Sequence, residues 1–179
     1  PRTKNEIMSI LGVIFRTAYH WEIIDRNPME GVGKMHVDPE ESGVFTIEEL
    51  QTMFAGDHPW WSDSIKMCWM LAAFAGMRRG EIMALRWDRV DENIITVDQA
   101  IVDVKTFEIG PPKWGRTRRV PIPAILVHEL HQLERHGDLV VMNEEGRLTA
   151  NWWKRSFAAG MAEMKISPHD RKLKPHSFR

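Results

Sequence analysis

Hydrophobic residues recur at helical spacing near the start of the chain. Because an α-helix turns every 3.6 residues, apolar positions three and four apart share one face, and this pattern predicts an amphipathic helix over about residues 5–25. The pair Asn27-Pro28 should end it, since a residue before proline is disfavoured in helical conformation. The apolar positions of this face are Ile7, Ile10, Leu11, Ile14, Phe15 and Ala18.

The pattern changes after Pro28. Residues 29–43 contain three glycines, a proline and several acidic residues but few large apolar ones, which is typical of an interdomain linker. We therefore expect residues 1–28 to be the end of a neighbouring domain, residues 29–43 to be a linker, and residues 44–179 to be a second domain.

The second domain has mainly helical patterns. Thr46 and Glu49 have the spacing of a capping box and should begin a short helix through Phe54. Ser62 or Asp63 can cap an apolar helix through Ala75, and the glycine after it should end that helix. Further helical patterns lie over about residues 79–85, 124–136 and 149–164, the last capped by Thr149.

Short β-rich runs interrupt these helices. They cover residues 94–97, 100–104 and 118–122 and are separated by turn residues, so they predict a small antiparallel sheet. A further short strand is expected over residues 139–142. The predicted fold class is therefore α+β, mostly helical, with a small antiparallel β-sheet.

Composition and charge narrow the possible functions only a little. The 179 residues are 43% hydrophobic and carry a formal net charge of -1, so any contact with nucleic acid must come from local basic clusters. The single cysteine, Cys68, lies in an apolar run, which excludes a disulfide framework and suits a reducing cytoplasm. Without a signal-like start or an apolar stretch near 18 residues, the chain is expected to be soluble and cytoplasmic, with no membrane partner.

The first candidate for chemistry is the segment Gly76-Met77-Arg78-Arg79-Gly80-Glu81. It puts an arginine just after one predicted helix and at the N-terminus of the next, where anions are favoured. Arg78 is thus a candidate phosphate ligand, with Glu81 as a supporting hydrogen-bond partner. The alternative interpretation is a solvated arginine pair on a surface turn.

A second candidate is the basic run from Pro112 to Pro123. Lys113 lies between the predicted strands over residues 100–104 and 118–122, where a flexible ammonium could act as a general acid. Four basic residues occur among the seven from Lys113 to Arg119 without an acidic one, so phosphate contacts are expected here. The expected contacts beside the lysine are Arg116, Arg118 and Arg119. On composition alone, Lys113 could equally be a solubilising loop residue.

The third candidate closes the sequence. His176 and Arg179 are three residues apart, so on a helix they would share a face and could bind one phosphate. Lys172 and Lys174 add charge beside them. The nearby run His169-Asp170-Arg171-Lys172 also has a basic residue three positions after a histidine, but that residue is a lysine. The pair His176 and Arg179 is therefore preferred.

These three motifs, in this order and with a β-rich region between the first and the third, resemble the catalytic domain of tyrosine recombinases, the phage-integrase family. The resemblance covers residues 44–179, and residues 1–28 look like the last helix of the family's core-binding domain. It implies that Arg78, Lys113, His176 and Arg179 are catalytic, that Glu81 supports them, and that Lys113 lies in the turn of a β-hairpin.

The resemblance also implies a reaction. Members of the family cleave and rejoin double-stranded DNA through a 3′-phosphotyrosyl intermediate during site-specific recombination, as tetramers of protomers on DNA. Fixed guanidinium groups would stabilise the charge that develops on the phosphate, so neither metal nor other cofactor is expected. Lys113 would protonate the leaving 5′ oxygen.

One feature departs from the family pattern. The family places its nucleophilic tyrosine downstream of the third motif, whereas the only tyrosine here is Tyr19, in the first predicted helix. A tyrosine on an amphipathic helix is usually a core or interface ring. We therefore expect the chain as printed to lack the nucleophile and not to cleave DNA.

Other functions remain open at this point. His128, His131 and His136 could suggest a metal-dependent hydrolase, but no H-E-x-x-H motif accompanies them, so exposed helix histidines are favoured. A non-catalytic DNA-binding protein could use Trp60-Trp61 and Trp152-Trp153 as contact aromatics, although helical tryptophans usually belong to the core. A type IB topoisomerase would use the same residue set as a recombinase.

Overall fold

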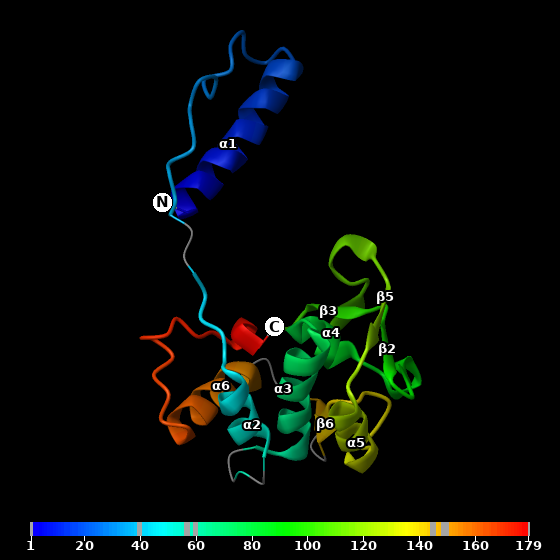
Figure 1. Cartoon of the computed structure of the whole chain (residues 1–179). Coiled ribbons are helices and arrows are strands. Elements are labelled where there is room, and N and C mark those ends of the chain that lie inside the picture. The colour runs from blue at the N-terminus through cyan, green and yellow to red at the C-terminus, as the bar shows by residue number, and fades with distance from the viewer. Residues whose placement is uncertain are drawn as a thin grey trace. The chain divides into compact units, whose positions relative to one another are not determined.

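The computed structural model describes residues 2–38, 41–55, 58, 61–143, 146–147 and 151–178 (Figure 1). It divides into two compact units, Pro1–Glu41 and Ser42–Arg179, which are taken separately below. Residues 29–41, assigned above to a linker, therefore fall within the first unit.

The first unit contains one helix, α1 (Arg2–His20), which ends before the predicted residue 25. Ile23 N donates to Ala18 O at 2.9 Å and Glu22 N donates to Tyr19 O at 3.0 Å, while Glu22 has φ 57°. This is a Schellman ending, in which a left-handed residue closes the last turn. The prediction was wrong here because that residue is a glutamate instead of the usual glycine.

No residue of α1 is buried. Its apolar positions Ile7, Ile10 and Ile14 are each more than half exposed, as expected for a helix whose apolar face needs a partner. Asn5 ties the segment that follows the helix back to it: Oδ1 accepts from Met35 N and Nδ2 donates to Met35 O, both at 2.8 Å. Two hydrogen bonds between residues 30 positions apart therefore join the two ends of the first unit.

Local capping signals set the helices at the start of the second unit. Helix α2 (Ile47–Phe54) begins with the predicted capping box: Thr46 N donates to Glu49 Oε2 at 2.8 Å and Glu49 N to Thr46 Oγ1 at 3.2 Å. Helix α3 (Asp63–Ala75) is capped by Ser62 and ends at Gly76, whose φ of 59° is left-handed. Both predictions are confirmed.

The remaining helices are α4 (Arg79–Ala84), α5 (Ala124–Gln132) and α6 (Trp152–Glu163), with short 3-10 helices η1 (Trp87–Arg89), η2 (Lys113–Gly115) and η3 (Pro175–Phe178). Helix α5 is shorter than predicted because Leu133 leaves the helix, with ψ 126°, and packs against the core. The predicted cap of α6, Thr149, lies outside the described residues. None of the described helices is long and apolar enough to span a bilayer.

The strands form several small sheets where the sequence predicted one. Strands β1 (Val90–Asp91), β2 (Ile94–Val97) and β5 (Arg118–Pro121) make an antiparallel sheet in the order β1-β2-β5. A separate hairpin pairs β3 (Ala100–Asp103) with β4 (Glu108–Gly110), and β6 (Met142–Asn143) pairs with β7 (Gly146–Arg147). In the run predicted as a strand over residues 139–142, Leu139 makes an isolated bridge with Arg86 and Met142 begins β6.

Helix α3 lies at the centre of the second unit, with α2 and α6 on one side and the β-strands on the other (Figure 1). Cys68 is completely buried in it, and this burial raises the pKa of the thiol well above its usual value. The Trp69 ring packs 4.1 Å from Trp153 and 4.7 Å from Phe178, and its Nε1 donates to Ser156 Oγ at 3.1 Å.

The tryptophan pairs considered above as DNA contacts have other surroundings. Trp152 and Trp153 are 6% and 4% exposed and belong to the core. Trp61 is partly buried against the same core, and Trp60 lies outside the described residues.

Candidate active site

Arg78 lies in the turn between α3 and α4, and Glu81 holds it there. Arg78 is the residue before α4, and its backbone N–H donates to Glu81 Oε2 at 2.8 Å, which satisfies one free donor of the helix start. The Arg78 guanidinium also donates, through Nη1, to Glu81 Oε1 at 3.0 Å. The hydrogen-bonding support that the sequence predicted for Arg78 is present.

A second arginine grips the same carboxylate. Arg118 on β5 donates Nη1 to Glu81 Oε1 at 2.9 Å and Nη2 to Glu81 Oε2 at 2.7 Å, a two-pronged arrangement. Each carboxylate oxygen thus accepts one bond from Arg118 and one from Arg78. We call Arg78, Glu81 and Arg118 the Glu81 clamp.

Sequence reasoning assigned Arg118 to the phosphate contacts and missed its pairing with Glu81. The signal was the alternation along β5, where Arg118 and Val120 are partly buried while Arg119 and Pro121 are exposed. Because successive strand residues point to opposite faces, Arg118 shares the inward face with Val120. Only Arg119 of this arginine pair points to solvent.

The clamp buries its acid and leaves its bases partly open. The Glu81 side chain is 1% exposed, whereas those of Arg78 and Arg118 are 35% and 34% exposed. Burial alone would raise the pKa of Glu81, but hydrogen bonds from Arg118 and from the backbone and side chain of Arg78 lower it to about 2. The hydrogen bonds to Glu81 in turn raise the pKa of Arg118. At neutral pH the clamp is one carboxylate between two guanidinium ions.

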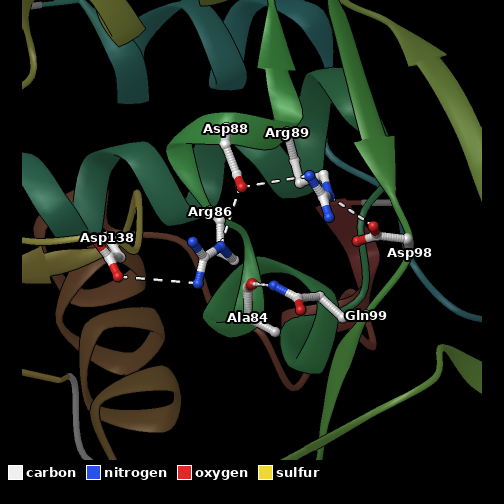
Figure 2. Close-up of polar contacts among 7 residues, drawn as sticks. All are labelled: Ala84, Arg86, Asp88, Arg89, Asp98, Gln99 and Asp138. Atoms are coloured by element: carbon white, nitrogen blue, oxygen red, sulfur yellow. Dashed lines mark hydrogen bonds and ion pairs between the residues drawn. The ribbon is translucent and has the colours of Figure 1, made fainter.

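Close packing fixes α4 against β3. A Cβ on Gly80 would lie 2.7 Å from the carbonyl oxygen of Ile101, so only glycine allows this approach of the helix to the strand. Gln99 Nε2 donates to the carbonyl oxygen of Ala84 at 2.6 Å, which ties the end of α4 to the turn between β2 and β3 (Figure 2). Arg89 Nε donates to Asp98 Oδ2 at 2.6 Å in the same turn.

Arg86 extends this network toward the chain that follows α5 (Figure 2). Its Nε donates to Asp88 Oδ1 at 3.1 Å, and its Nη1 is 3.9 Å from Asp138 Oδ2. The backbone adds a bond from Val140 N to Leu85 O at 2.9 Å. The segment after α4 is therefore fixed both by the side chain of Arg86 and by the backbone of Leu85, which restricts how far the Glu81 clamp can move.

Lys113 lies on the connection between β4 and β5. Since β4 pairs with β3 and β5 pairs with β2, this connection joins two sheets and is not the tip of a two-stranded hairpin, as the resemblance had implied. Lys113 Nζ is 5.5 Å from the centroid of the Trp114 ring, and Trp114 is 80% exposed with φ 75°. Lys113 and Arg116 are exposed as well. We call residues 112–117 the basic loop.

The third motif lies on η3. Phe178 anchors this short helix, stacking on Phe45 with ring centroids 4.4 Å apart, while His176 on the same helix is exposed. Lys172 and Lys174 are exposed too. Arg179 lies outside the described residues, so the predicted meeting of His176 and Arg179 has no structural counterpart here.

The competing run 169–172 has different contacts. Arg171 Nη2 donates to Val44 O at 2.9 Å, and its Nη1 pairs with the Glu49 carboxylate. Gly43 N donates to the carbonyl oxygen of Lys172 at 3.2 Å. Arg171 therefore serves to fasten the start of the second unit to its end, which leaves the later motif as the better phosphate-binding candidate.

Neighbouring elements carry the first and third motifs. Helix η3 packs against α3, which leads through Gly76 to Arg78 (Figure 1). Within the described ranges, however, no hydrogen bond or ion pair joins His176 or Lys113 to the clamp. The structure thus brings together Arg78, Glu81 and Arg118, and leaves His176 and Lys113 on separate exposed elements.

The histidines that suggested a metal site do not form one in the described part of the chain. No group of three or more histidine, cysteine, aspartate or glutamate side chains there could hold a metal ion. His128 and His131 are exposed on α5, and His136 follows that helix.

Comparison with known proteins identifies relatives among integrases, although no family model matches the chain. The ICEBs1 integrase of Bacillus subtilis (strain 168) is 31% identical over 97 residues, 54% of this chain and 26% of that protein. The prophage integrase IntR of Escherichia coli (strain K12) is 27% identical over 141 residues, 75% of this chain and 33% of that protein. The chain thus spans about a quarter to a third of these curated relatives.

Solved structures share the fold. The Tn1549 transposon integrase in complex with transposon right end DNA matches with a TM-score of 0.82 at 18% identity, covering 99% of this chain and 64% of that one. A lambda integrase dimer bound to a COC' core site matches with a TM-score of 0.71 at 16% identity, covering 97% and 49%. The fold expected from the sequence is therefore confirmed. The chain is thus similar in sequence to integrases and shares the fold of solved integrase structures, in agreement with the resemblance that its motifs indicated.

Proposed function

We propose that the chain is part of an integrase-type site-specific recombinase, which cleaves and rejoins DNA through a 3′-phosphotyrosyl intermediate. The observation that carries this proposal is the Glu81 clamp, in which a buried carboxylate holds two partly exposed guanidinium groups beside the N-terminus of α4. Such fixed donors stabilise charge that develops on a phosphodiester without reorganising during the reaction. The integrase names of the curated relatives support the same function.

Each candidate residue has a proposed role. Arg78 binds a nonbridging oxygen of the scissile phosphate, with Arg179 and His176 as further ligands of the same phosphate, and Glu81 fixes Arg78. Lys113 protonates the leaving 5′ oxygen, because an exposed ammonium on a loop can reach into the DNA. Arg116, Arg119, Lys172 and Lys174 contact neighbouring phosphates.

The proposed partners are double-stranded DNA and further recombinase protomers, assembled as a tetramer on the DNA. Support comes from solved relatives, among which the Tn1549 integrase is bound to transposon DNA and the lambda integrase is a dimer on a core site. The net charge of -1 means that DNA binding must depend on the local basic groups. Binding by the 179-residue chain is therefore expected to be weak and largely independent of DNA sequence.

DNA binding and covalent capture together test the proposal. The 179-residue chain should bind duplex DNA with an affinity that falls steeply between about 50 and 200 mM salt. Absence of binding at about 50 mM salt, or affinity that salt does not change, would contradict the proposal.

A DNA substrate that traps the cleaved strand should give no covalent adduct with this chain, because its only tyrosine, Tyr19, lies on α1. A chain extended by a tyrosine-bearing segment should form one. Arg78→Ala should then lower the rate of adduct formation about 10²- to 10³-fold, and Tyr19→Phe should leave it unchanged. An adduct of the 179-residue chain that Tyr19→Phe abolishes would show that the nucleophile is misassigned.

A further inference from the structure

We infer that Arg118 is a positioning residue, which acts on the scissile phosphate through Glu81 and keeps the Glu81 clamp positively charged. This inference rests on the proposed function and changes the role expected for Arg118 from the sequence, where it was counted among direct phosphate contacts.

The two arginines use their donors differently. Arg118 donates hydrogen bonds from both terminal nitrogens, Nη1 and Nη2, to the two oxygens of Glu81. Arg78 donates only one guanidinium hydrogen bond to Glu81, from Nη1, and its second bond to that carboxylate comes from the backbone N–H. Within the described residues, Nη2 and Nε of Arg78 and Nε of Arg118 make no hydrogen bond. Arg78 therefore keeps an adjacent pair of donors for a phosphate, whereas both terminal nitrogens of Arg118 are already bonded to Glu81.

Charge balance gives Arg118 a second effect. Glu81 and Arg78 alone would form a neutral pair, because the carboxylate cancels the one guanidinium charge. With Arg118 the clamp has two positive charges and one negative charge, a net charge of +1 at neutral pH. Since the attraction between charges is strong where water is excluded, this net charge favours an anion beside Arg78.

The sheet holds Arg118 in place. Strand β5 pairs with β2 in a register that sets Arg118 opposite Val97 and Arg119 opposite Thr96. Val97 is 2% exposed, so this end of the pair is fixed by the core. Arg119 lies on the same strand, points to solvent and is absent from the Glu81 clamp, which makes it a matched control.

The test is a double-mutant cycle on duplex DNA affinity at fixed salt. Arg118→Gln should weaken binding about 10-fold or more, because the clamp loses its net positive charge and Glu81 is no longer held from the sheet side. Adding Glu81→Gln should recover most of this loss, because the neutral glutamine no longer cancels the charge of Arg78. Arg119→Gln should also weaken binding, but Glu81→Gln should change the affinity by the same factor in this background as in the wild type, so that the two effects add.

Each result decides between the two roles of Arg118. If the Arg118→Gln and Glu81→Gln double variant binds no better than Arg118→Gln alone, Arg118 contacts DNA directly and the inference is wrong. If the wild-type chain does not bind DNA, the proposed function itself fails. Thermal unfolding checks that the variants are folded, and Arg118→Lys, which keeps the charge without the fork, should retain an intermediate affinity.

A different observation supports a second inference: we infer that Trp114 in the basic loop contacts DNA, stacking on a base or sugar. Among the described large hydrophobic residues Trp114 is the most exposed, at 80%, although tryptophan normally lies in a core or an interface. Its φ of 75° is left-handed, and Gly115 follows with φ 64°. Left-handed backbone at a bulky residue is unfavourable and tends to occur at functional sites.

The surroundings of Trp114 indicate the kind of partner. Lys113 Nζ lies over its ring, and Arg116 is exposed two residues later, so an aromatic surface is presented among positive charges. Proteins that bind single-stranded nucleic acid use this combination of a stacking aromatic ring and basic groups along the phosphate backbone. An apolar protein partner would require a larger area without the charges.

Tryptophan fluorescence and affinity test this contact. DNA should quench part of the fluorescence of the wild-type chain, and Trp114→Phe should remove most of that quenching. Trp21→Phe, which replaces the 72% exposed tryptophan of the first unit, is the control and should leave it in place. Trp114→Ala should weaken binding about five-fold or more. Unchanged quenching and affinity in the Trp114 variants, with wild-type DNA binding intact, would overturn this inference alone.

Discussion

The Glu81 clamp and the basic loop carry the same kind of charge in opposite settings. In the clamp, a carboxylate that is 1% exposed receives hydrogen bonds from both arginines, and close packing and polar contacts fix the helix that carries it. In the basic loop, Lys113, Trp114 and Arg116 are exposed, and the main internal contacts are the Lys113–Trp114 ring contact and the bond from Gly115 N to Pro112 O at 2.7 Å.

This difference indicates a division of tasks. The clamp is organised before any DNA arrives, so it can stabilise charge without being rearranged. The basic loop has few contacts to hold it. Under the proposed function, the DNA would therefore set its final conformation, and part of the binding energy would be used to order it. One half of the site therefore depends on folding and the other half on binding.

The largest expected effect comes from breaking the clamp. Glu81→Ala should lower the free energy of unfolding by about 3–5 kcal/mol, because it leaves two partly buried guanidinium groups without their counter-charge. Urea unfolding of the second unit measures it. A loss below about 1 kcal/mol would mean that the clamp does not contribute to the fold as described.

The contribution of the Glu81 clamp to the free energy of unfolding should depend on pH. The pKa of Glu81 is about 2, below its ordinary value of 4.5, so its contribution is fully present above pH 4.5 and is lost as the pH falls toward 2. The wild-type chain should lose about 3 kcal/mol over this range beyond the loss seen in Glu81→Gln. Parallel curves for the two proteins would contradict the lowered pKa.

The salt dependence of DNA affinity distinguishes residues that contact phosphates directly from residues that act through the Glu81 clamp. Arg116→Gln should reduce the slope of log affinity against log salt by about 0.9, since one phosphate contact and its released counterion are lost. Stability should stay within about 0.5 kcal/mol of wild type, because Arg116 is exposed. A slope equal to that of the wild type would remove Arg116 from the phosphate contacts.

The smallest change is expected for Lys113→Ala in the free protein. Its free energy of unfolding should differ from wild type by less than about 0.5 kcal/mol, because the side chain is exposed. Amide hydrogen exchange at residues 113–116 should be fast without DNA and slower with DNA, whereas the amides of α4 should be protected in both states. Equal protection of the basic loop and α4 in the free protein would contradict the conclusion that the loop is held less firmly than the clamp.

The parts of the fold that depend on local signals could be predicted from the sequence. Thr46 with Glu49 and Gly76 set helix boundaries through contacts within a few residues, and the structure has them as expected. The end of α1 was missed because Glu22 takes a conformation that is usually reserved for glycine.

Contacts between distant residues could not be predicted in the same way. The three β-rich runs could be recognised in the sequence. Their pairing could not, and the structure pairs β2 with β5 and β3 with β4. Likewise, Glu81 was identified as the support of Arg78 from its spacing, whereas Arg118 lies 37 residues from Glu81. Strand alternation could have indicated that Arg118 faces inward, but its partner depends on tertiary packing.

The complete burial of Cys68 has a practical consequence for studying this protein. It is the only cysteine of the sequence, and a buried thiol with a raised pKa reacts slowly with maleimides and related reagents. The 179-residue chain therefore provides a low background for thiol-specific labelling. A fluorophore or spin label attached through Arg116→Cys would report on the basic loop without any need to replace Cys68 first.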